Sequence, residues 1–427
     1  MIGAVMFVLL IGLMFIGIPI AFSMGLSAVI MLLINATATP VAITTRAVNS
    51  LDSFTTMAIP FFMMASFILT GSNVGVKIFR FAGTAVRHLR GGLAHVNVLT
   101  SMIMAGMSGS AVSDVSGIGR MEIDAMEDAG YDTDFSAAVT AASSTIAPII
   151  PPSTSCVLYG SITGVSIGAL LIGGLTPGIL MGILQMIICW FTAKKRGYAL
   201  QPKASRHETW VAFKDSFAAM MMPVILIVGI LSGFFTPTEG ACVATVYSIF
   251  IGMFVYKTLT FKKLIKILMD TSVFAGATLF VLSMASIFGL VLTHNQIPTT
   301  LTNFFLGLSN NKYVLLFFIN ILLLILGMLM EGNAIYMIMG PILGMMAVQL
   351  GCDPVHFGIM VIFNLTLGLI TPPVGLCLFL TQKVAKITTS QMIKSIMPFV
   401  IMMIICLLII TYFPPLVTWL PSMFNLC

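Results

Sequence analysis

Long apolar runs follow one another along almost the whole chain, separated by short polar stretches. Asp, Glu, Lys and Arg make up only 8% of the 427 residues, whereas they make up about a quarter of a typical soluble protein. Because so few charges cannot cover a globule of this size with a water-compatible surface, most of the surface must face lipid. The sequence therefore predicts an all-α polytopic membrane protein embedded in a lipid bilayer, and it excludes nearly every class of soluble enzyme.

The basic residues indicate which ends of the spans face the cytoplasm. The formal net charge is +6, and the bases gather in four short stretches, interpreted as cytoplasmic loops, around 77–90, 194–196, 257–266 and 383–394. They form no continuous stripe of the kind that binds nucleic acid, so no nucleic-acid partner is predicted. With five crossings expected in each half of the chain, both termini, Met1 and Cys427, should lie on the outer side.

Two segments must enter and leave the membrane on the same side if all four basic stretches are to be cytoplasmic. The segment around 94–128 is predicted to form a re-entrant helical hairpin that enters from the cytoplasm. The segment 313–350 is predicted to form a second hairpin, of opposite orientation, that enters from the outer side. Two oppositely oriented hairpins suggest that the two halves of the chain are related.

The chain also matches itself at an offset of 221 residues. The pair Pro151-Pro152 recurs as Pro372-Pro373, and the same offset joins Gly106 to Gly327, Gly130 to Gly351 and Pro177 to Pro398. Because each half holds an odd number of crossings, the second copy must be inserted upside down relative to the first. An inverted repeat with hairpins is typical of a secondary transporter.

Small polar residues lie where the first hairpin is predicted to turn, at 108–114. They leave backbone carbonyls and hydroxyls unpaired near the middle of the membrane, and such groups can replace water around a hard cation. A Gly/Ser seam that only packs helices would look the same. The segment 143–155 favours the binding interpretation, because its prolines remove hydrogen-bond donors and must break a membrane helix beside the hairpin.

The second half repeats this arrangement. Gly332 and Asn333 are predicted to turn its hairpin, and its helix is predicted to break through Asn364, Thr366, Gly368, Thr371 and Pro372-Pro373. Two polar tips that face two broken helices place polar backbone at the bilayer midplane. Because this placement is costly unless the polar groups bind something, both tips are candidate binding sites.

Asp114 and Glu331 are the acids at the two hairpin turns. A carboxylate inside the membrane is expected to be functional, as an ion ligand or as a proton carrier. For Asp114 a helix N-cap is an equally good interpretation, because Val115-Ser116-Gly117 follow it. Glu239 is predicted to be a helix cap, because it opens a span just after Pro237.

Six further acids are predicted to form a solvated cytoplasmic face without chemistry, namely Glu122, Asp124, Glu127, Asp128, Asp132 and Asp134. Oxygen-rich helix breaks therefore outnumber buried carboxylates, which favours coupling to sodium over coupling to protons. No GxxxxGK[ST] motif occurs, so no nucleotide cofactor is predicted and pumping must draw on an ion gradient. A proton-coupled transporter and an uncoupled channel remain as alternatives.

Gly106-Met107-Ser108-Gly109 also fits the GxSG pattern of intramembrane serine proteases. A serine nucleophile needs an imidazole within hydrogen-bond reach, and the five histidines lie in loops or at the ends of spans. The prediction is therefore that the chain is not an enzyme.

Four motifs together resemble the large membrane subunit of tripartite ATP-independent periplasmic (TRAP) transporters. They are the 108–114 turn, the break at 147–153, the sequence Phe235-Thr236-Pro237-Thr238-Glu239 and the sequence Thr371-Pro372-Pro373-Val374-Gly375. The resemblance covers essentially the whole chain and is close to the sialic-acid members, although C4-dicarboxylate members share these motifs. It implies a sodium-coupled importer of organic acids with an elevator-type fold, located in the bacterial inner membrane with both termini periplasmic.

The resemblance also implies two partners, a small four-helix membrane subunit (Q) and a soluble periplasmic substrate-binding protein (P), each supplied by a separate chain. It implies scaffold helices at 1–52 and 216–266, which dock the small subunit. Transport units are implied at 53–192 and 267–427, with a cytoplasmic linker at 193–215. The two units are expected to move together while the scaffold stays fixed.

Carried over by position, at least two Na⁺ ions would bind. The first sodium site would comprise Ser108, Gly109, Asp114, Ser143 and Ser144, and the second would comprise Gly332, Asn333, Thr366, Gly368 and Thr371. The anionic substrate would lie between the two sites and meet half-helix N-termini together with the hydroxyls of Ser110, Ser153 and Thr154.

Overall fold

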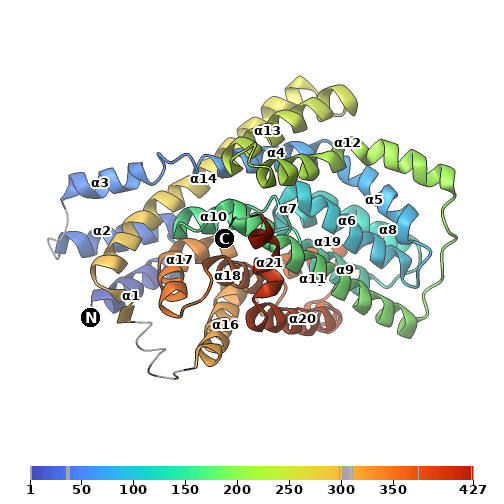
Figure 1. Cartoon of the computed structure of the whole chain (residues 1–427). Coiled ribbons are helices and arrows are strands. Elements are labelled where there is room, and N and C mark those ends of the chain that lie inside the picture. Colours follow the sequence, from blue (N-terminus) through green and yellow to red (C-terminus); the bar gives the residue numbers. More distant parts are fainter. Residues whose placement is uncertain are drawn as a thin grey trace.

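A computed structural model of the chain shows an assembly of helices packed side by side (Figure 1). It describes residues 2–34, 39–297, 299–300, 307, 309, 311–373, 375–424 and 426, so that Met1, Val374 and Cys427 lie outside the described residues. Among the described helices, seven are long and apolar enough to cross a membrane. The prediction of an all-α polytopic membrane protein is confirmed.

The helices of the first half are α1 (Ile2–Phe15), α2 (Ile20–Ile34), α3 (Pro40–Asn49), α4 (Ala58–Gly71), α5 (Val74–Val86), α6 (Gly92–Ser108), α7 (Ala111–Asp114), the π-helix η1 (Val115–Gly119), α8 (Arg120–Asp128), α9 (Thr133–Ser144), α10 (Thr154–Thr163) and α11 (Ile167–Arg196). Those of the second half are α12 (Arg206–Leu231), α13 (Pro237–Phe250), the π-helix η2 (Ile251–Val255), α14 (Phe261–His294), α16 (Lys312–Leu329), α17 (Gly332–Gln349), α18 (Pro354–Gly368), α19 (Leu376–Ala385), α20 (Thr389–Tyr412) and α21 (Pro415–Met423).

Both predicted hairpins are present. In the first, α6 and the helix Ala111–Asp128 are bent by 120° relative to each other at a short break. The far ends of this hairpin meet, because the backbone N–H of Leu93 donates to the Tyr131 hydroxyl at 3.4 Å. In the second hairpin, α16 and α17 are joined by Met330 and Glu331 alone.

The packing of the helices repeats with the two halves exchanged. Helix α2 packs on α14, and its counterpart α13 packs on α4. In the same way α10 packs on α17 and α19 on α7 and α8, while α9 packs on α20 and α18 on α11. Reciprocal contacts of this kind are what an inverted repeat produces, so the offset of 221 residues reflects a structural repeat.

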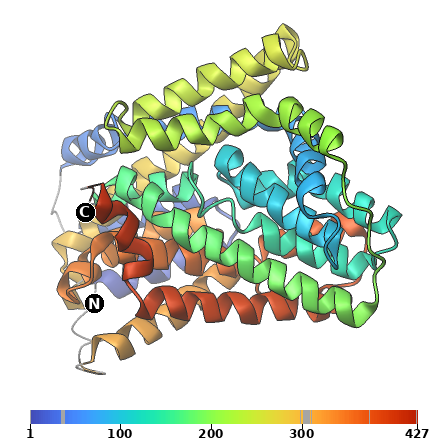
Figure 2. The same cartoon turned by 45° about the vertical axis from the view of Figure 1, so that its right-hand side comes forward.

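Each basic stretch lies at least partly on a helix, so the interpretation as loops was wrong in part, although Arg87, Arg90, Lys257 and Lys386 do lie between helices. Lys77 and Arg80 lie in α5, Lys194 to Arg196 form the last turn of α11, and Lys383 lies in the last turn of α19. Lys and Arg are good helix formers whose charged ends can reach water from a helix end, so a basic stretch need not interrupt a helix. In Figure 2, α1 and α21 lie toward one end of the molecule, and the connection from α11 to α12 lies at the opposite end.

Candidate ion and substrate site

A cavity lies where the two hairpin tips meet the two breaks. The first hairpin contributes Ser110, Ala111 and Val112, and the first break contributes Pro148, Thr154 and Ser155. The second half contributes Glu331, Gly332, Asn333, Tyr336, Leu365, Thr366 and Leu369. The predicted meeting of two polar tips with two broken helices is therefore confirmed in the geometry.

Three helices begin at this cavity. Residues in the first turns of the helix Ala111–Asp128, of α10 and of α17 are all in its lining. A helix N-terminus presents unpaired N–H groups and carries about half a positive charge. The arrangement suits an anion that binds between the hairpin tips.

The tip of the first hairpin is held against the first break by hydrogen bonds. Thr154 Oγ1 donates to the Gly109 carbonyl at 2.8 Å, and the Thr154 backbone N–H donates to the same oxygen at 3.4 Å. A side chain at Gly109 is excluded, because a Cβ atom there would lie 2.4 Å from the Pro152 carbonyl oxygen and the backbone has a φ of +59°. This tip and this break therefore form one unit.

Asp114 belongs to a buried polar cluster, here called the Asp114 cluster, that joins the first hairpin to α9. Ser101 donates to Asp114 Oδ2 at 2.9 Å, and the Ser143 oxygen lies 3.1 Å from the Ser101 oxygen. Ser143 in turn donates to Asn97 Oδ1 at 2.7 Å, and Asn97 donates to Thr140 at 2.7 Å. Asp114 is only 3% exposed, and its Oδ1 has no hydrogen-bond partner among the described residues.

The cap interpretation of Asp114 is wrong. The N-cap at the start of α7 is Ser110, whose hydroxyl accepts from the Ser113 N–H at 3.5 Å. The Asp114 side chain makes no capping hydrogen bond, because the helix runs on directly into η1. Its carboxylate therefore has an unused oxygen inside the protein, which suits a cation ligand.

Three of the hydroxyls predicted as ligands keep their oxygen lone pairs available. Ser144 donates to the Ala141 carbonyl at 2.9 Å, while Thr366 and Thr371 donate to carbonyls four residues earlier at 2.7 Å. Because each hydroxyl gives its proton to the backbone, its oxygen is free to accept from or coordinate a cation. Ser108 Oγ is buried, and in the part of the chain that the structure describes it has no hydrogen-bond partner, hence no histidine of the kind that the protease alternative requires.

The predicted break of the second half begins later than expected. Asn364, Thr366 and Gly368 all lie within α18, and the break follows it, before α19 begins. A proline disturbs the helix mainly at the carbonyl four residues before it, so Pro372 leaves the residues up to Gly368 helical. The break itself thus contains Thr371 but not the other two predicted ligands.

Five of the predicted site residues line the cavity, and the others lie outside its lining. Two of those outside it have structural roles. Ser153 is fully buried as the N-cap of α10, where it accepts from the Cys156 N–H and donates to the Pro148 carbonyl. Gly368 faces the backbone of Gly327, and a Cβ at Gly368 would lie 2.5 Å from its carbonyl carbon. Gly368 thus allows α16 and α18 to approach closely.

Glu122 was placed wrongly on a solvated face. It is only 1% exposed, and no described residue forms a hydrogen bond with its Oε1. The spacing of its neighbours indicates that Glu122 is buried. Ile118, Glu122 and Met126 are four residues apart and share one buried face of the helix. The capping prediction for Glu239 is confirmed, because Thr236 and Glu239 form a reciprocal capping box.

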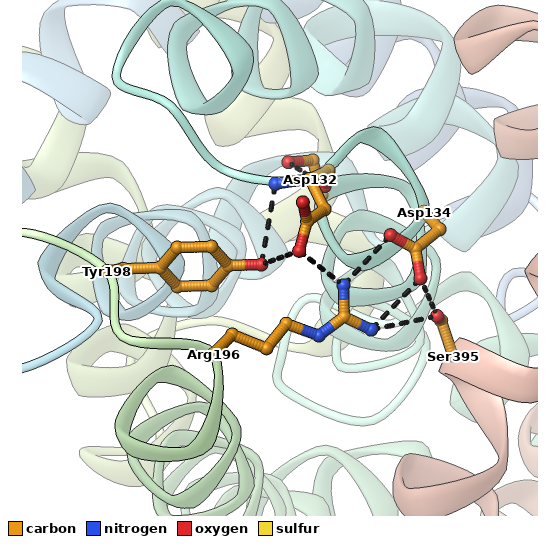
Figure 3. A network of polar contacts seen from close by, with 6 residues as sticks. Asp132, Asp134, Arg196, Tyr198 and Ser395 are labelled. Atoms are coloured by element: carbon orange, nitrogen blue, oxygen red, sulfur yellow. Dashed lines mark hydrogen bonds and ion pairs between the residues drawn. The ribbon is translucent and has the colours of Figure 1, made fainter.

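An ion-pair network closes the end of the molecule where α11 ends (Figure 3). Arg196 pairs with Asp132 and Asp134 at 2.8 and 2.9 Å, and Ser395 of α20 also donates to Asp134. Tyr198 donates to Asp132 at 2.7 Å. The hydrogen bonds from Tyr198 and Arg196 hold the pKa of Asp132 below its usual value. The network joins the first half of the chain to α20 of the second.

Comparison with known proteins identifies the family. Residues 7–416 match the family described as "Tripartite ATP-independent periplasmic transporter, DctM component". The chain belongs to this family. It is 39% identical over 414 residues to the sialic acid TRAP transporter large permease protein SiaM of Vibrio cholerae, with 97% of each chain covered.

The chain is also 36% identical over 441 residues to the C4-dicarboxylate TRAP transporter large permease protein DctM of Vibrio cholerae, with 98% of this chain and 97% of that protein covered. The crystal structure of the YdaH transporter of Alcanivorax borkumensis has the same fold, with a TM-score of 0.63, 14% identity and 87% of each chain covered. The predicted resemblance to TRAP large subunits is confirmed. The chain is therefore a multi-pass TRAP transporter permease.

Proposed function

We propose that this TRAP permease is the large subunit of a sodium-coupled importer of an organic acid, with sialic acid (N-acetylneuraminate) as the first candidate and a C4-dicarboxylate as the second. The observation that carries this proposal is the charge of the cavity. Its described lining includes hydroxyls, an amide, three helix N-termini and one acid, Glu331, but no Lys, Arg or His.

An organic anion in this cavity needs positive charge nearby. The helix N-termini supply part of it, about half a unit charge each and only over their first turns. Glu331 lies in the same lining, where its Oε1 accepts from Asn333 at 2.8 Å, and it adds a further acid. Sodium ions bound beside the cavity would balance both the anion and the acid, so substrate and ions would bind together.

In this proposal the first sodium ion binds at the tip of the first hairpin. Its ligands are the unused oxygen of Asp114, the oxygens of Ser108, Ser143 and Ser144, and the Gly109 carbonyl. The second ion binds between the tip residues Gly332 and Asn333 and the oxygens of Thr366 and Thr371, with the carbonyl of Gly368 nearby. Ser110 and Thr154 line the cavity and contact the substrate, while Ser153 holds the start of α10 in place.

A periplasmic substrate-binding protein would deliver the acid, and a small membrane subunit would pack against the scaffold at 1–52 and 216–266. The hairpins and breaks would move together across the membrane as an elevator, because hydrogen bonds tie the first tip to the first break and the cavity spans both halves. Both termini would be periplasmic. In a Cys-free background, labelling of Ser390→Cys from outside intact cells would contradict this orientation, whereas Lys312→Cys should be labelled.

The substrate is tested with the complex reconstituted in liposomes together with its binding protein. Under an inward sodium gradient, labelled N-acetylneuraminate should accumulate, and excess unlabelled succinate should not compete. Accumulation of succinate in place of N-acetylneuraminate would select the second candidate. If neither acid accumulates while the complex is intact by size-exclusion chromatography, import of these acids is contradicted.

A further inference from the structure

Glu122 is an acid inside the first hairpin that the proposed sodium sites do not use. It is 1% exposed, its Oε1 has no hydrogen-bond partner, and no salt bridge involves it among the described residues. A buried carboxylate without a partner is expensive, so it is retained only where it pairs with a mobile ion or carries a proton. The nearest base in sequence, Arg120, is instead paired with Asp124 at 2.9 Å on the surface of the helix.

The backbone between Asp114 and Glu122 aligns the two acids. In a regular α-helix, residues eight apart point about 80° away from each other. Here Val115–Gly119 form a π-helical turn, whose wider winding brings the two positions to within roughly 20° of the same face. Such turns occur frequently at functional sites.

Four buried side-chain oxygens on the two arms of this hairpin are left without hydrogen bonds among the described residues. They are Ser108 Oγ, Thr100 Oγ1, Asp114 Oδ1 and Glu122 Oε1. Because the tip is at Ser108 and α8 runs back to the ion-pair network at Asp132, Glu122 lies between the Asp114 cluster and that end of the hairpin. The step from Asp114 to Glu122 is roughly 10 Å along the helix axis.

The charged groups on the elements around α8 are engaged elsewhere or exposed. His95 of α6 contacts the Arg90 carbonyl through Nε2 at 3.1 Å, Asp134 of α9 pairs with Arg196, and Lys383 of α19 is exposed. Arg120 also donates to the Val384 carbonyl at 2.7 Å. None of these contacts neutralises Glu122 within the described part of the chain.

We propose that Glu122 is a transient cation-binding site, here called the Glu122 site. It receives a sodium ion from the Asp114 cluster and passes it to the cytoplasmic end of α8. This proposal rests on the sodium coupling proposed above. It adds the direction in which the sodium ion moves through the first hairpin. Ions would reach Asp114 from the hairpin tip and leave past Glu122. Removing the Glu122 charge should therefore alter exchange of sodium with the inner side and leave binding from the outer side nearly unchanged.

The test is Glu122→Gln in the reconstituted complex, with Asp128→Asn as the matched control because Asp128 is an exposed acid of the same helix. Substrate uptake is titrated with external sodium and, separately, with sodium loaded inside the liposomes, which inhibits uptake by rebinding. We expect Glu122→Gln to raise the internal sodium concentration for half-inhibition at least about fivefold and to change the external half-saturation by less than about twofold. The control should match the wild type in both titrations.

Each other outcome has a defined meaning. If the wild type depends on sodium and Glu122→Gln behaves like the wild type in both titrations, the Glu122 site is overturned while sodium coupling stands. If Glu122→Gln loses only a dependence of uptake on internal pH, Glu122 carries a proton and its role as a sodium-binding site is overturned. If uptake by the wild type does not respond to sodium on either side, both sodium coupling and the Glu122 site are overturned. Should Glu122→Gln fail to assemble, Glu122→Asp, which keeps the charge, must retain internal sodium inhibition within about threefold.

Discussion

The two hairpins occupy equivalent places in the repeat but are held in different ways. The first tip is locked, because Gly109 leaves no room for a Cβ beside Pro152, whereas a Cβ at Gly332 in the second tip would meet its nearest atom at 3.7 Å. Behind the first tip lies a cluster built around the carboxylate of Asp114. Behind the second lies a cluster of amides, in which Asn364 donates to Asn320 at 2.8 Å and Asn320 donates to Thr411 at 2.9 Å.

This difference shows that the two halves of an inverted repeat can share a backbone geometry while their side chains at equivalent positions have different chemistry. Ser143 and Asn364 are related by the offset of 221 residues, yet Ser143 is linked to the acid Asp114 through Ser101, whereas Asn364 donates only to the neutral amide Asn320 among the described residues. A neutral cluster of this kind can hold helices together without an ion. The Asp114 cluster should therefore control the affinity of the first sodium site, and the amide cluster of the second half should control stability.

The largest expected effect comes from the locked tip. Gly109→Ala should lower uptake at least about tenfold, because the new Cβ collides with the Pro152 carbonyl and the backbone conformation disfavours a side chain. Gly332→Ala changes a glycine of the second tip where a Cβ has room, and it should retain most of the uptake. Initial uptake rates, normalised to assembled complex, make the comparison. Equal losses in the two variants would contradict the difference between the tips.

The second prediction concerns the acid of the first cluster. Asp114→Asn removes a charge from a desolvated site and should raise the sodium concentration for half-maximal uptake tenfold or more, about 1.4 kcal/mol or above. The shape and the hydrogen bond from Ser101 are largely kept, so the protein should still assemble. Sodium-titrated uptake measures the shift. An unchanged midpoint would remove Asp114 from the sodium ligands.

The third prediction tests the neutral cluster. Asn364→Leu removes the donor to Asn320 and leaves buried acceptors unpaired, which should cost about 1–3 kcal/mol of stability. The apparent Tm of the purified complex should fall by several degrees, while the sodium midpoint stays within about twofold of the wild type. A sodium shift as large as that of Asp114→Asn would mean that both clusters bind cations.

The smallest expected effect lies where the halves are tied together by Arg196. The folded pKa of Asp132 is lower than its ordinary value of 3.8, so its ion pair stabilises the protein above that value, and the contribution is lost as pH falls through the folded pKa. Asp132→Asn should cost about 1 kcal/mol or less at pH 7, because the pair is largely exposed. The Tm difference from wild type should vanish at acidic pH, whereas Asp128→Asn should show no difference at either pH.

The sequence was sufficient for the membrane class, both hairpins, the repeat and the cavity, because apolar runs, prolines and small polar residues are local signals. Ser110, Thr154, Gly332, Asn333 and Thr366 were predicted from such signals, and the structure brings them to one cavity. The basic stretches were partly misjudged as loops, because a positive charge marks a side of the membrane and does not end a helix.

Other features depend on contacts between distant segments. Glu122 resembled its exposed acidic neighbours, and only the spacing of Ile118 and Met126 indicated a buried face. The π-helical turn between Asp114 and Glu122 has no sequence signature that would have aligned the two acids. Ser153 looked like a ligand because a serine in a break can equally cap the next helix, and only the position of the Pro148 carbonyl decides between the two.

The most direct test of sodium coupling is uptake by the reconstituted complex under one gradient at a time, with the binding protein and labelled N-acetylneuraminate present. An inward sodium gradient at equal pH on both sides should drive accumulation, and collapsing that gradient with a sodium ionophore should abolish it. A pH gradient in the absence of sodium should drive none. Accumulation under the pH gradient alone, with no response to sodium, would contradict the assignment of the hairpin sites to sodium.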